Sequence, residues 1–125
     1  MKDFLKFIWQ FPQNLIALIY REYLNGKGVM LAIEYYKGII IYYTKDTVGN
    51  VSLGDSIFIS ATASSRIVKH ELGHTRQSLI LGPLYLIVIG IPSIIWAAIH
   101  RAIAPDKPYN WFYTEAWANK LGGVD

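Results

Sequence analysis

The chain has no cysteine among its 125 residues, which excludes disulfide bridges and thiolate metal ligands. Charged residues are sparse, at 17%, and the net charge is only +3. Lysine and arginine are scattered rather than clustered, so the sequence does not favour nucleic-acid binding. Apolar residues make up 53% of the chain. That is enough for one domain, residues 1–125, with a hydrophobic core of its own.

A long stretch without formal charge stands out in this composition. No Asp, Glu, Lys, Arg or His occurs from Ser78 to Ile99, and about 20 apolar residues are enough to span a bilayer. Glycine and proline interrupt the stretch at Gly82-Pro83 and at Gly90-Ile91-Pro92, which argues against one straight helix. We therefore expect a short buried segment over residues 84–89 and a helix that begins at the second interruption. Membrane insertion or an interfacial hairpin is the alternative.

The N-terminal region raises the same question. Residues 4–19 are rich in aliphatic and aromatic side chains, and Pro12 divides them into two helical stretches. Together with Lys2, Lys6 and Arg21, these side chains suit a helix at a membrane interface, but they equally suit a helix packed on a domain core. No small-residue cleavage site follows, so no signal peptide is predicted. We expect a cytoplasmic or membrane-associated protein.

A β region follows this helix. Residues 29–36 and 39–44 are rich in β-branched and aromatic side chains, and Lys37-Gly38 joins them as a hairpin. Residues 45–50 read as a loop and residues 56–60 as a further strand. With helices on both sides of this region, the predicted fold class is α+β with a small antiparallel or mixed sheet.

The most informative motif is the string His-Glu-Leu-Gly-His at residues 70–74. On a helix, residues four apart lie on one face, so His70 and His74 can reach the same metal ion. Glu71 lies beside them, close enough to take a proton from a water molecule on that ion. This arrangement is typical of zinc hydrolases, and it predicts one Zn²⁺ per chain with Glu71 as the general base.

The residues around the motif support a helix. Ser64 and Ser65 are N-cap candidates, and Gly82-Pro83 is a clear stop signal. Gly73 costs about 1 kcal/mol relative to alanine inside a helix. We therefore expect that another group approaches the backbone closely at this position.

A catalytic zinc site usually has three protein ligands and one open position. Without cysteine, the third ligand must be His, Glu or Asp. Glu115 is the best candidate, because it lies in a predicted C-terminal helix where Ala118 and Asn119 share its face. His100, on a predicted helix, and Asp106, in a turn between prolines, are the two alternatives.

At this point the chain resembles the gluzincin metallopeptidases, whose pattern is His-Glu-x-x-His followed by a glutamate ligand on a downstream helix. The resemblance covers residues 69–77 and 113–119 and implies a minimal, minigluzincin-like domain. The family pattern usually has an aspartate where Asn119 stands, and an asparagine can accept the same imidazole hydrogen bond without adding charge. The resemblance further implies that a strand edge binds extended substrate, for which we take residues 57–60.

The function expected from these features is zinc-dependent hydrolysis of peptide bonds in a peptide or protein substrate. His70, His74 and Glu115 are the expected metal ligands, and Tyr113, or else Tyr109, is the expected oxyanion donor. Two alternatives remain open at this stage. One is a non-catalytic zinc-binding or interaction module of a larger bacterial system, and the other is a membrane-embedded peptidase. The sequence does not determine the oligomeric state.

Overall fold

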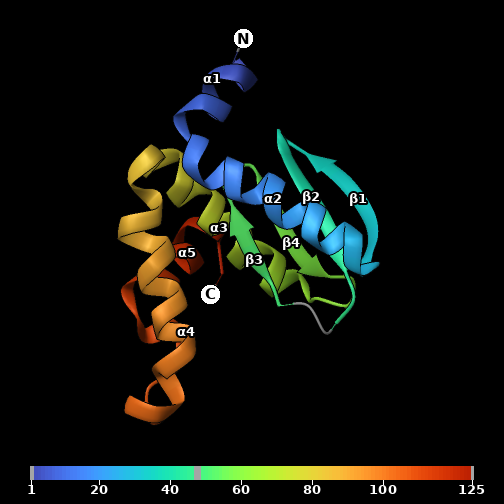
Figure 1. Cartoon of the computed structure of the whole chain (residues 1–125). Helices are drawn as coiled ribbons and strands as arrows, with labels where there is room; N and C mark the ends of the chain where they lie inside the picture. Colours follow the sequence, from blue (N-terminus) through green and yellow to red (C-terminus); the bar gives the residue numbers. More distant parts are fainter. Residues whose placement is uncertain (1, 47–48, 125) are drawn as a thin grey trace.

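The computed structural model describes residues 2–46 and 49–124 and confirms the α+β fold (Figure 1). The α-helices and strands are α1 (Lys2–Trp9), α2 (Phe11–Lys27), β1 (Met30–Tyr36), β2 (Ile39–Thr44), β3 (Val51–Leu53), β4 (Ser56–Ser60), α3 (Ser65–Leu81), α4 (Ile91–Ile103) and α5 (Tyr113–Gly122). Shorter helical turns are η1 (Gly82–Leu84), the wide π-turn η2 (Leu86–Gly90) and η3 (Tyr109–Trp111).

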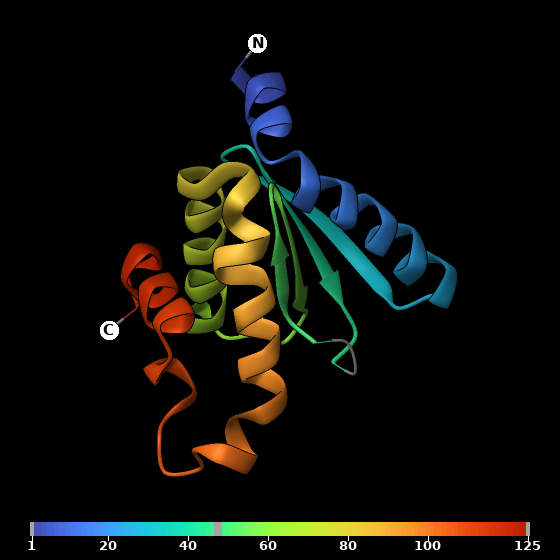
Figure 2. The same ribbon diagram turned by 60° about the vertical axis from the view of Figure 1, so that its left-hand side comes forward.

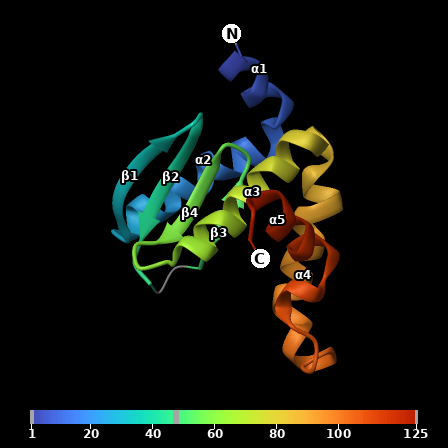
Figure 3. The ribbon, with the colours of Figure 1, turned by 180° about the vertical axis from the view of Figure 1, so that it is seen from behind.

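The four strands form one mixed sheet in the order β1-β2-β4-β3. The β1–β2 and β3–β4 pairs are antiparallel hairpins, and β2 and β4 run parallel in the centre. Helix α2 covers one face of the sheet, where Tyr42 stacks on Phe58 at 4.8 Å between ring centroids. Helix α3 packs on the other face, where Leu72 contacts the cluster around Ile57. Figures 1 and 3, viewed from opposite sides, show the sheet between these two helices.

The sheet order corrects one sequence prediction. Residues 57–60 lie in β4, which pairs with β2 along its whole length and with β3 along residues 56–58, so β4 is not the edge strand of the sheet. The edge strand on that side is β3, residues 51–53, which the sequence analysis did not identify as a strand. Gly54, with φ of +62°, makes the tight turn that folds β3 back along β4. Three residues are too few to show the alternation by which strands are recognised.

Helix α3 begins and ends where its sequence predicts. The Ser64 side chain accepts a hydrogen bond from the Ile67 N–H, which satisfies one of the donors left free at a helix start. At the other end, Gly82 has a positive φ of 56° and the chain leaves the helix before Pro83. The metal motif therefore occupies the middle of a regular helix of 17 residues.

The apolar segment after α3 corrects a second prediction. Gly90 and Pro92 do not break the helix, because Gly90 is helical and the Ile91 N–H donates to the Leu86 carbonyl across a wide π-turn. The helical turns from Leu86 to Ile103 are continuous, and this segment is long and apolar enough to cross a membrane. Only 11% of it is buried. The prediction of a buried segment over residues 84–89 is therefore wrong.

The closest helix packing in the fold is between α3 and α5. A Cβ atom placed on Gly73 would lie 1.7 Å from the carbonyl oxygen of Ala118, and one on Gly122 would lie 1.9 Å from that of Lys69. Ala118 itself is fully buried. The expected close approach at Gly73 is therefore confirmed, and the approaching group is the backbone of α5.

Replacing Gly73 by alanine should destabilise the protein although alanine is the better helix former. The added methyl group must push α5 away from α3, which should lower the free energy of unfolding by roughly 1–3 kcal/mol or more. The matched control is Gly26→Ala in α2, where a Cβ would meet no described atom within 4 Å. There the free energy of unfolding should rise by up to about 1 kcal/mol. Urea denaturation of both variants measures the difference, and equal stability would contradict the close-packing argument.

Candidate metal centre

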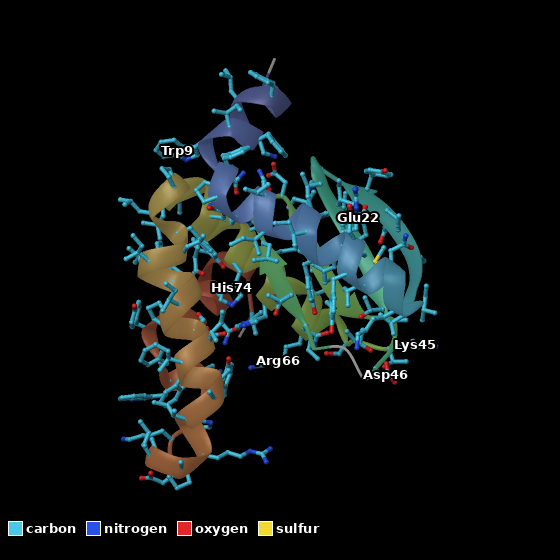
Figure 4. The ribbon with its side chains drawn as sticks, viewed as in Figure 1. Trp9, Glu22, Lys45, Asp46, Arg66 and His74 are labelled. Atoms are coloured by element: carbon cyan, nitrogen blue, oxygen red, sulfur yellow. The ribbon has the colours of Figure 1, made fainter. Side chains whose placement is uncertain are left out.

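Two imidazoles of α3 form one side of the candidate centre. His70 and His74 lie one turn apart, and their ring centroids are 4.7 Å apart with the rings nearly perpendicular. His74 is buried, whereas His70 is partly exposed. Figure 4 shows His74 in the interior, between α4 and the sheet. The Nε2 atoms of both rings are directed at the same point on α5.

That point is the Glu115 carboxylate. Its Oε1 atom lies 3.1 Å from His70 Nε2 and 3.2 Å from His74 Nε2, and the residue is only 2% exposed. Two donors that each sit about 2.0–2.1 Å from a tetrahedral ion are about 3.3 Å apart. The Glu115 oxygen therefore lies at nearly the spacing of a shared metal ion from each of the two histidine nitrogens. This donor set of two nitrogens and one oxygen suits Zn²⁺.

The opposite nitrogen of each imidazole is held by a side-chain amide. His70 Nδ1 lies 2.5 Å from Asn119 Oδ1, and His74 Nδ1 lies 2.7 Å from Gln77 Oε1. Because an amide oxygen can only accept, each Nδ1 carries a proton. Each Nε2 then faces Glu115 in one of two forms: with a second proton, which it donates to the carboxylate, or in the neutral ring with the lone pair that a metal ion would need. Asn119 thus performs the orienting role that the sequence analysis assigned to this position. Gln77 was not predicted.

Glu115 is held at both oxygens. Its Oε2 atom accepts hydrogen bonds from the hydroxyls of Ser93 at 2.8 Å and Thr114 at 2.7 Å, while Oε1 faces the histidines. Burial works to raise the pKa of this carboxyl group, but the hydrogen bonds with His70 and His74 outweigh it and hold the pKa well below the usual range. Glu115 is therefore an anion at neutral pH, as a metal ligand must be.

The charge of Glu115 also affects His70. Burial works to lower the pKa of His70, but the hydrogen bonds to Glu115 and Asn119 outweigh this effect, and the pKa is raised above its ordinary value of 6.5. Without a metal, a proton on His70 thus stabilises the buried carboxylate. A metal ion must displace this proton in order to bind.

Glu71 lies beside the three candidate ligands and is not itself one of them. Its ligand atom is within 4.8 Å of those of His70 and His74. The carboxylate is buried, and the hydroxyl of Ser52, on the edge strand β3, lies 2.7 Å from its Oε1 atom. The edge strand therefore positions the predicted general base. This contact was not predicted, because the strand itself was not.

These groups line a cavity of about 790 Å³ between α2, β3, α3, α4 and η3. His70, Glu71, His74 and Glu115 contribute the polar side chains at its base, and isoleucines such as Ile16 and Ile94 contribute apolar surface. Arg66, near the start of α3, also lines it and lies towards the lower end of the opening in Figure 4. The cavity is large enough for several residues of an extended peptide.

The structure does not bring Tyr113 to this cavity. Its side chain is half exposed, and its hydroxyl donates a hydrogen bond to the Val88 carbonyl at 2.7 Å. The tyrosines that line the cavity are Tyr85 and Tyr109. Burial, with the nearby charges of Glu71 and Glu115, raises the pKa of Tyr85 and raises that of Tyr109 to about 12. Both phenols therefore keep their protons at neutral pH and can act as donors.

The two other third-ligand candidates lie away from the centre. His100 is at the far end of α4, where its ring packs on Trp96 at 4.6 Å between centroids and its Nε2 contacts the Lys107 carbonyl. Asp106 is an exposed residue of the turn that follows α4. Neither lines the cavity, so Glu115 alone of the three candidates meets the two histidines.

The contributions of Ser52, Gln77, Ser93 and Tyr85 were missed because they are set by tertiary packing. Gln77 had the clearest signal, since it lies three residues after His74 on the same helix. Ser93 follows Pro92, and in the sequence this position indicates only the start of a helix.

Comparison of the chain with known protein families, with curated proteins and with solved structures finds no match.

The electrostatic coupling of the centre can be measured in metal-free protein. The pKa of the His70 imidazole should lie above 6.5 in the wild type. In Glu115→Ala this pKa should fall, because the hydrogen bond and the charge of Glu115 no longer raise it while burial still lowers it. The control is Glu34→Ala, which removes an exposed carboxylate hydrogen-bonded to Tyr43 and should leave His70 unchanged. An NMR titration of the imidazole signals tests this, and an unaltered pKa in Glu115→Ala would contradict the coupling.

Proposed function

We propose that the protein is a zinc-dependent metallopeptidase of the gluzincin type. The observation that carries this proposal is the convergence of His70 Nε2, His74 Nε2 and Glu115 Oε1, with the Glu71 carboxylate beside them. Orienting hydrogen bonds on both histidines and on Glu115 support it further. Such outer contacts are a regular feature of functional metal sites.

His70, His74 and Glu115 would hold the Zn²⁺, which when bound acidifies water and polarises a carbonyl group. Glu71 then takes a proton from the attacking water and passes it to the amine that leaves. The Ser52 hydroxyl keeps the Glu71 carboxylate in place for both transfers. Tyr85 and Tyr109 are the phenols in the cavity that could stabilise the oxyanion, in place of Tyr113.

The edge strand β3 gives the cavity a means of holding a peptide. Residues 51–53 line the cavity and pair with β4 on one side only. The free edge of a strand offers N–H and C=O groups to an extended chain. A peptide paired with β3 would lie next to Ser52 and hence next to Glu71. The substrate we propose is therefore an unfolded or extended segment of a peptide or protein.

The ligand assignment predicts how zinc affinity responds to substitution. Wild-type protein should bind about one Zn²⁺ per chain, and Glu115→Ala should weaken binding by more than about 100-fold, since it removes one of three ligands. Asn119→Ala removes only an orienting contact and should cost about 10- to 100-fold. His100→Ala and Asp106→Ala are the controls and should bind like the wild type.

Isothermal titration of chelator-treated protein measures these affinities, and the wild-type melting temperature should fall on chelation. Wild-type affinity in Glu115→Ala, or a large loss in His100→Ala, would contradict the assignment.

The role of Glu71 distinguishes an enzyme from a zinc-binding module. Glu71→Gln keeps the shape of the side chain but cannot accept a proton, so it should retain zinc and lose activity by about 10²- to 10⁴-fold. The matched control is Glu22→Gln on the exposed part of α2, which should cleave at the wild-type rate. The assay uses a peptide that the wild type cleaves, selected from a peptide mixture by mass spectrometry. Equal cleavage by Glu71→Gln would show that another group is the base. Zinc binding without cleavage of any peptide would favour the module.

A further inference from the structure

The first turns of helix α2 direct two polar side chains towards the protein, while further along the helix Ala17 and Leu24 are buried against the sheet. Gln13 is fully buried and donates to Ser78 Oγ at 2.8 Å and to the Gly82 carbonyl at 2.9 Å. Asn14 is also buried, and its Oδ1 accepts from the Asp55 N–H at 2.8 Å. On the outward side lie aliphatic residues, of which Ile19 is 63% exposed. A helix on the surface of a soluble domain has the reverse arrangement.

The segment formed by η2 and α4 exposes apolar residues in the same way. Ile87, Ile94 and Ile103 are each about two-thirds exposed, whereas Trp96 and Ile89 are the buried residues of this segment. No Asp, Glu, Lys, Arg or His occurs between Ser78 and Ile99. Two helical segments from distant parts of the chain thus both expose several aliphatic side chains. Isolated exposed apolar residues are ordinary, but a surface made of them is not.

These helices lie on one side of the molecule. In Figure 1, α2 lies in front of the sheet, and α4 lies beside the sheet and in front of α5; in Figure 3, seen from behind, the sheet lies in front of α2 and α5 lies in front of α4. Figure 2 shows α4 and α2 flanking the sheet on this side. We define the apolar face by its most exposed members, Phe4, Ile19, Ile87, Ile94 and Ile103.

The charges around the apolar face are complementary to an anionic lipid surface. Lys27 ends α2, while Arg101 and Lys107 lie at and after the end of α4. The chain as a whole carries +3. Lys107 also stands over the ring of Trp111, 5.5 Å from its centre, and tryptophan is enriched at the level of lipid headgroups. An uncharged apolar surface bordered by basic and aromatic residues is the pattern of interfacial membrane binding.

We propose that the apolar face of this protein binds the surface of an anionic lipid bilayer, with the outer sides of α1, α2 and α4 in the interfacial layer. The binding needs no metal ion. It is driven by burial of the exposed aliphatic side chains among the lipids and by attraction of the basic residues to the headgroups.

The structure favours interfacial binding over a transmembrane α4. Trp96, in the middle of α4, stacks on Phe112 at 4.9 Å and donates to the Tyr109 carbonyl at 2.6 Å. The connecting segment that contains Asp106 and Lys107 is therefore tied to α4. If α4 crossed the bilayer, this irregular, charged segment would have to enter the hydrocarbon with it, which is unfavourable.

The cavity opens next to the apolar face, which extends the proposed function. Ile16 of α2 and Ile94 of α4 both line the cavity and are both exposed at its edge. This step rests on the proposed metallopeptidase function. Because the cavity lies beside the apolar face, the substrate class that follows is polypeptides held at a membrane surface. A segment that leaves the bilayer would reach β3 and Glu71 without first crossing open solvent.

Vesicle flotation of the full-length protein tests the binding. Vesicles contain either equal parts of phosphatidylcholine and phosphatidylglycerol or phosphatidylcholine alone, and binding is measured with and without a chelator. The wild type should float with both, more strongly with the anionic vesicles, and equally after chelation. The double variant Ile19→Asp, Ile95→Asp changes one exposed residue on each helix, since Ile19 of α2 is 63% and Ile95 of α4 is 51% exposed. It should reduce the partition coefficient by at least roughly tenfold, because two exposed apolar side chains become anions.

The matched control for either single substitution is Tyr36→Asp, which also adds one carboxylate, at a half-exposed apolar position on the opposite face of the sheet. It should float like the wild type. Circular dichroism and zinc titration confirm that each variant is folded, so that a loss of flotation reports on the face itself. Equal flotation of wild type and double variant would overturn the proposal.

Two further outcomes also overturn it. One is a stable dimer that Ile95→Asp dissociates and that does not float, since a second copy would then cover the face. The other is wild-type protein that resists extraction from vesicles at alkaline pH, since α4 would then span the bilayer.

The substrate class is tested separately with one cleavable peptide, free in solution or linked to a lipid in the vesicles. The linked form should be cleaved at least roughly tenfold faster, because binding raises its local concentration, and the double variant should lose this preference. Cleavage without preference would overturn the substrate class alone. Flotation without zinc binding or any cleavage would instead contradict the proposed peptidase.

Discussion

The close contact between α3 and α5 is the constraint on which the rest of the structure depends. Gly73 and Gly122 let the two backbones approach so closely that a methyl group at either position would overlap a carbonyl group. At this separation the Glu115 carboxylate of α5 reaches both His70 and His74, which lie one turn apart on α3. Gln77 strengthens the contact, because its amide holds His74 and donates to the Thr114 carbonyl. The glycines that weaken the isolated helices therefore make the three-residue centre possible.

The centre is also balanced in charge. Two buried carboxylates, Glu71 and Glu115, lie close to two imidazoles in a region of low dielectric constant, where unpaired charge is costly. Neutral partners, Asn119 and Gln77, orient the imidazoles. An aspartate at residue 119 would add a third negative charge to this group. With the asparagine, a divalent cation would neutralise the two carboxylates without leaving an excess of either sign.

The parts of this arrangement that depend on neighbours in the sequence could be predicted, and the parts that depend on packing could not. Helical spacing identified His70 and His74, and the predicted C-terminal helix, together with the gluzincin resemblance, favoured Glu115 over His100 and Asp106. In contrast, Ser52 reaches Glu71 only because the short strand β3 turns back along β4. For the apolar segment after α3, burial was the preferred prediction, and membrane insertion or an interfacial hairpin was only the alternative. An apolar run has the same sequence whether protein or solvent covers it, so periodicity alone cannot show on which side its residues lie.

The exposed apolar surface of α2 and α4 is related to the side chains that these helices direct into the protein. Gln13 of α2 and Ser93 of α4 make polar contacts with the rest of the protein, beside the apolar cluster that Ala17 and Leu24 form with the sheet. On the turns that carry these polar residues, aliphatic neighbours lie on the outer side. Ser93 and Ile94 show the consequence most directly, since one hydrogen-bonds Glu115 and its neighbour is 69% exposed. One turn of α4 therefore contacts the candidate centre on one side and the surroundings of the protein on the other.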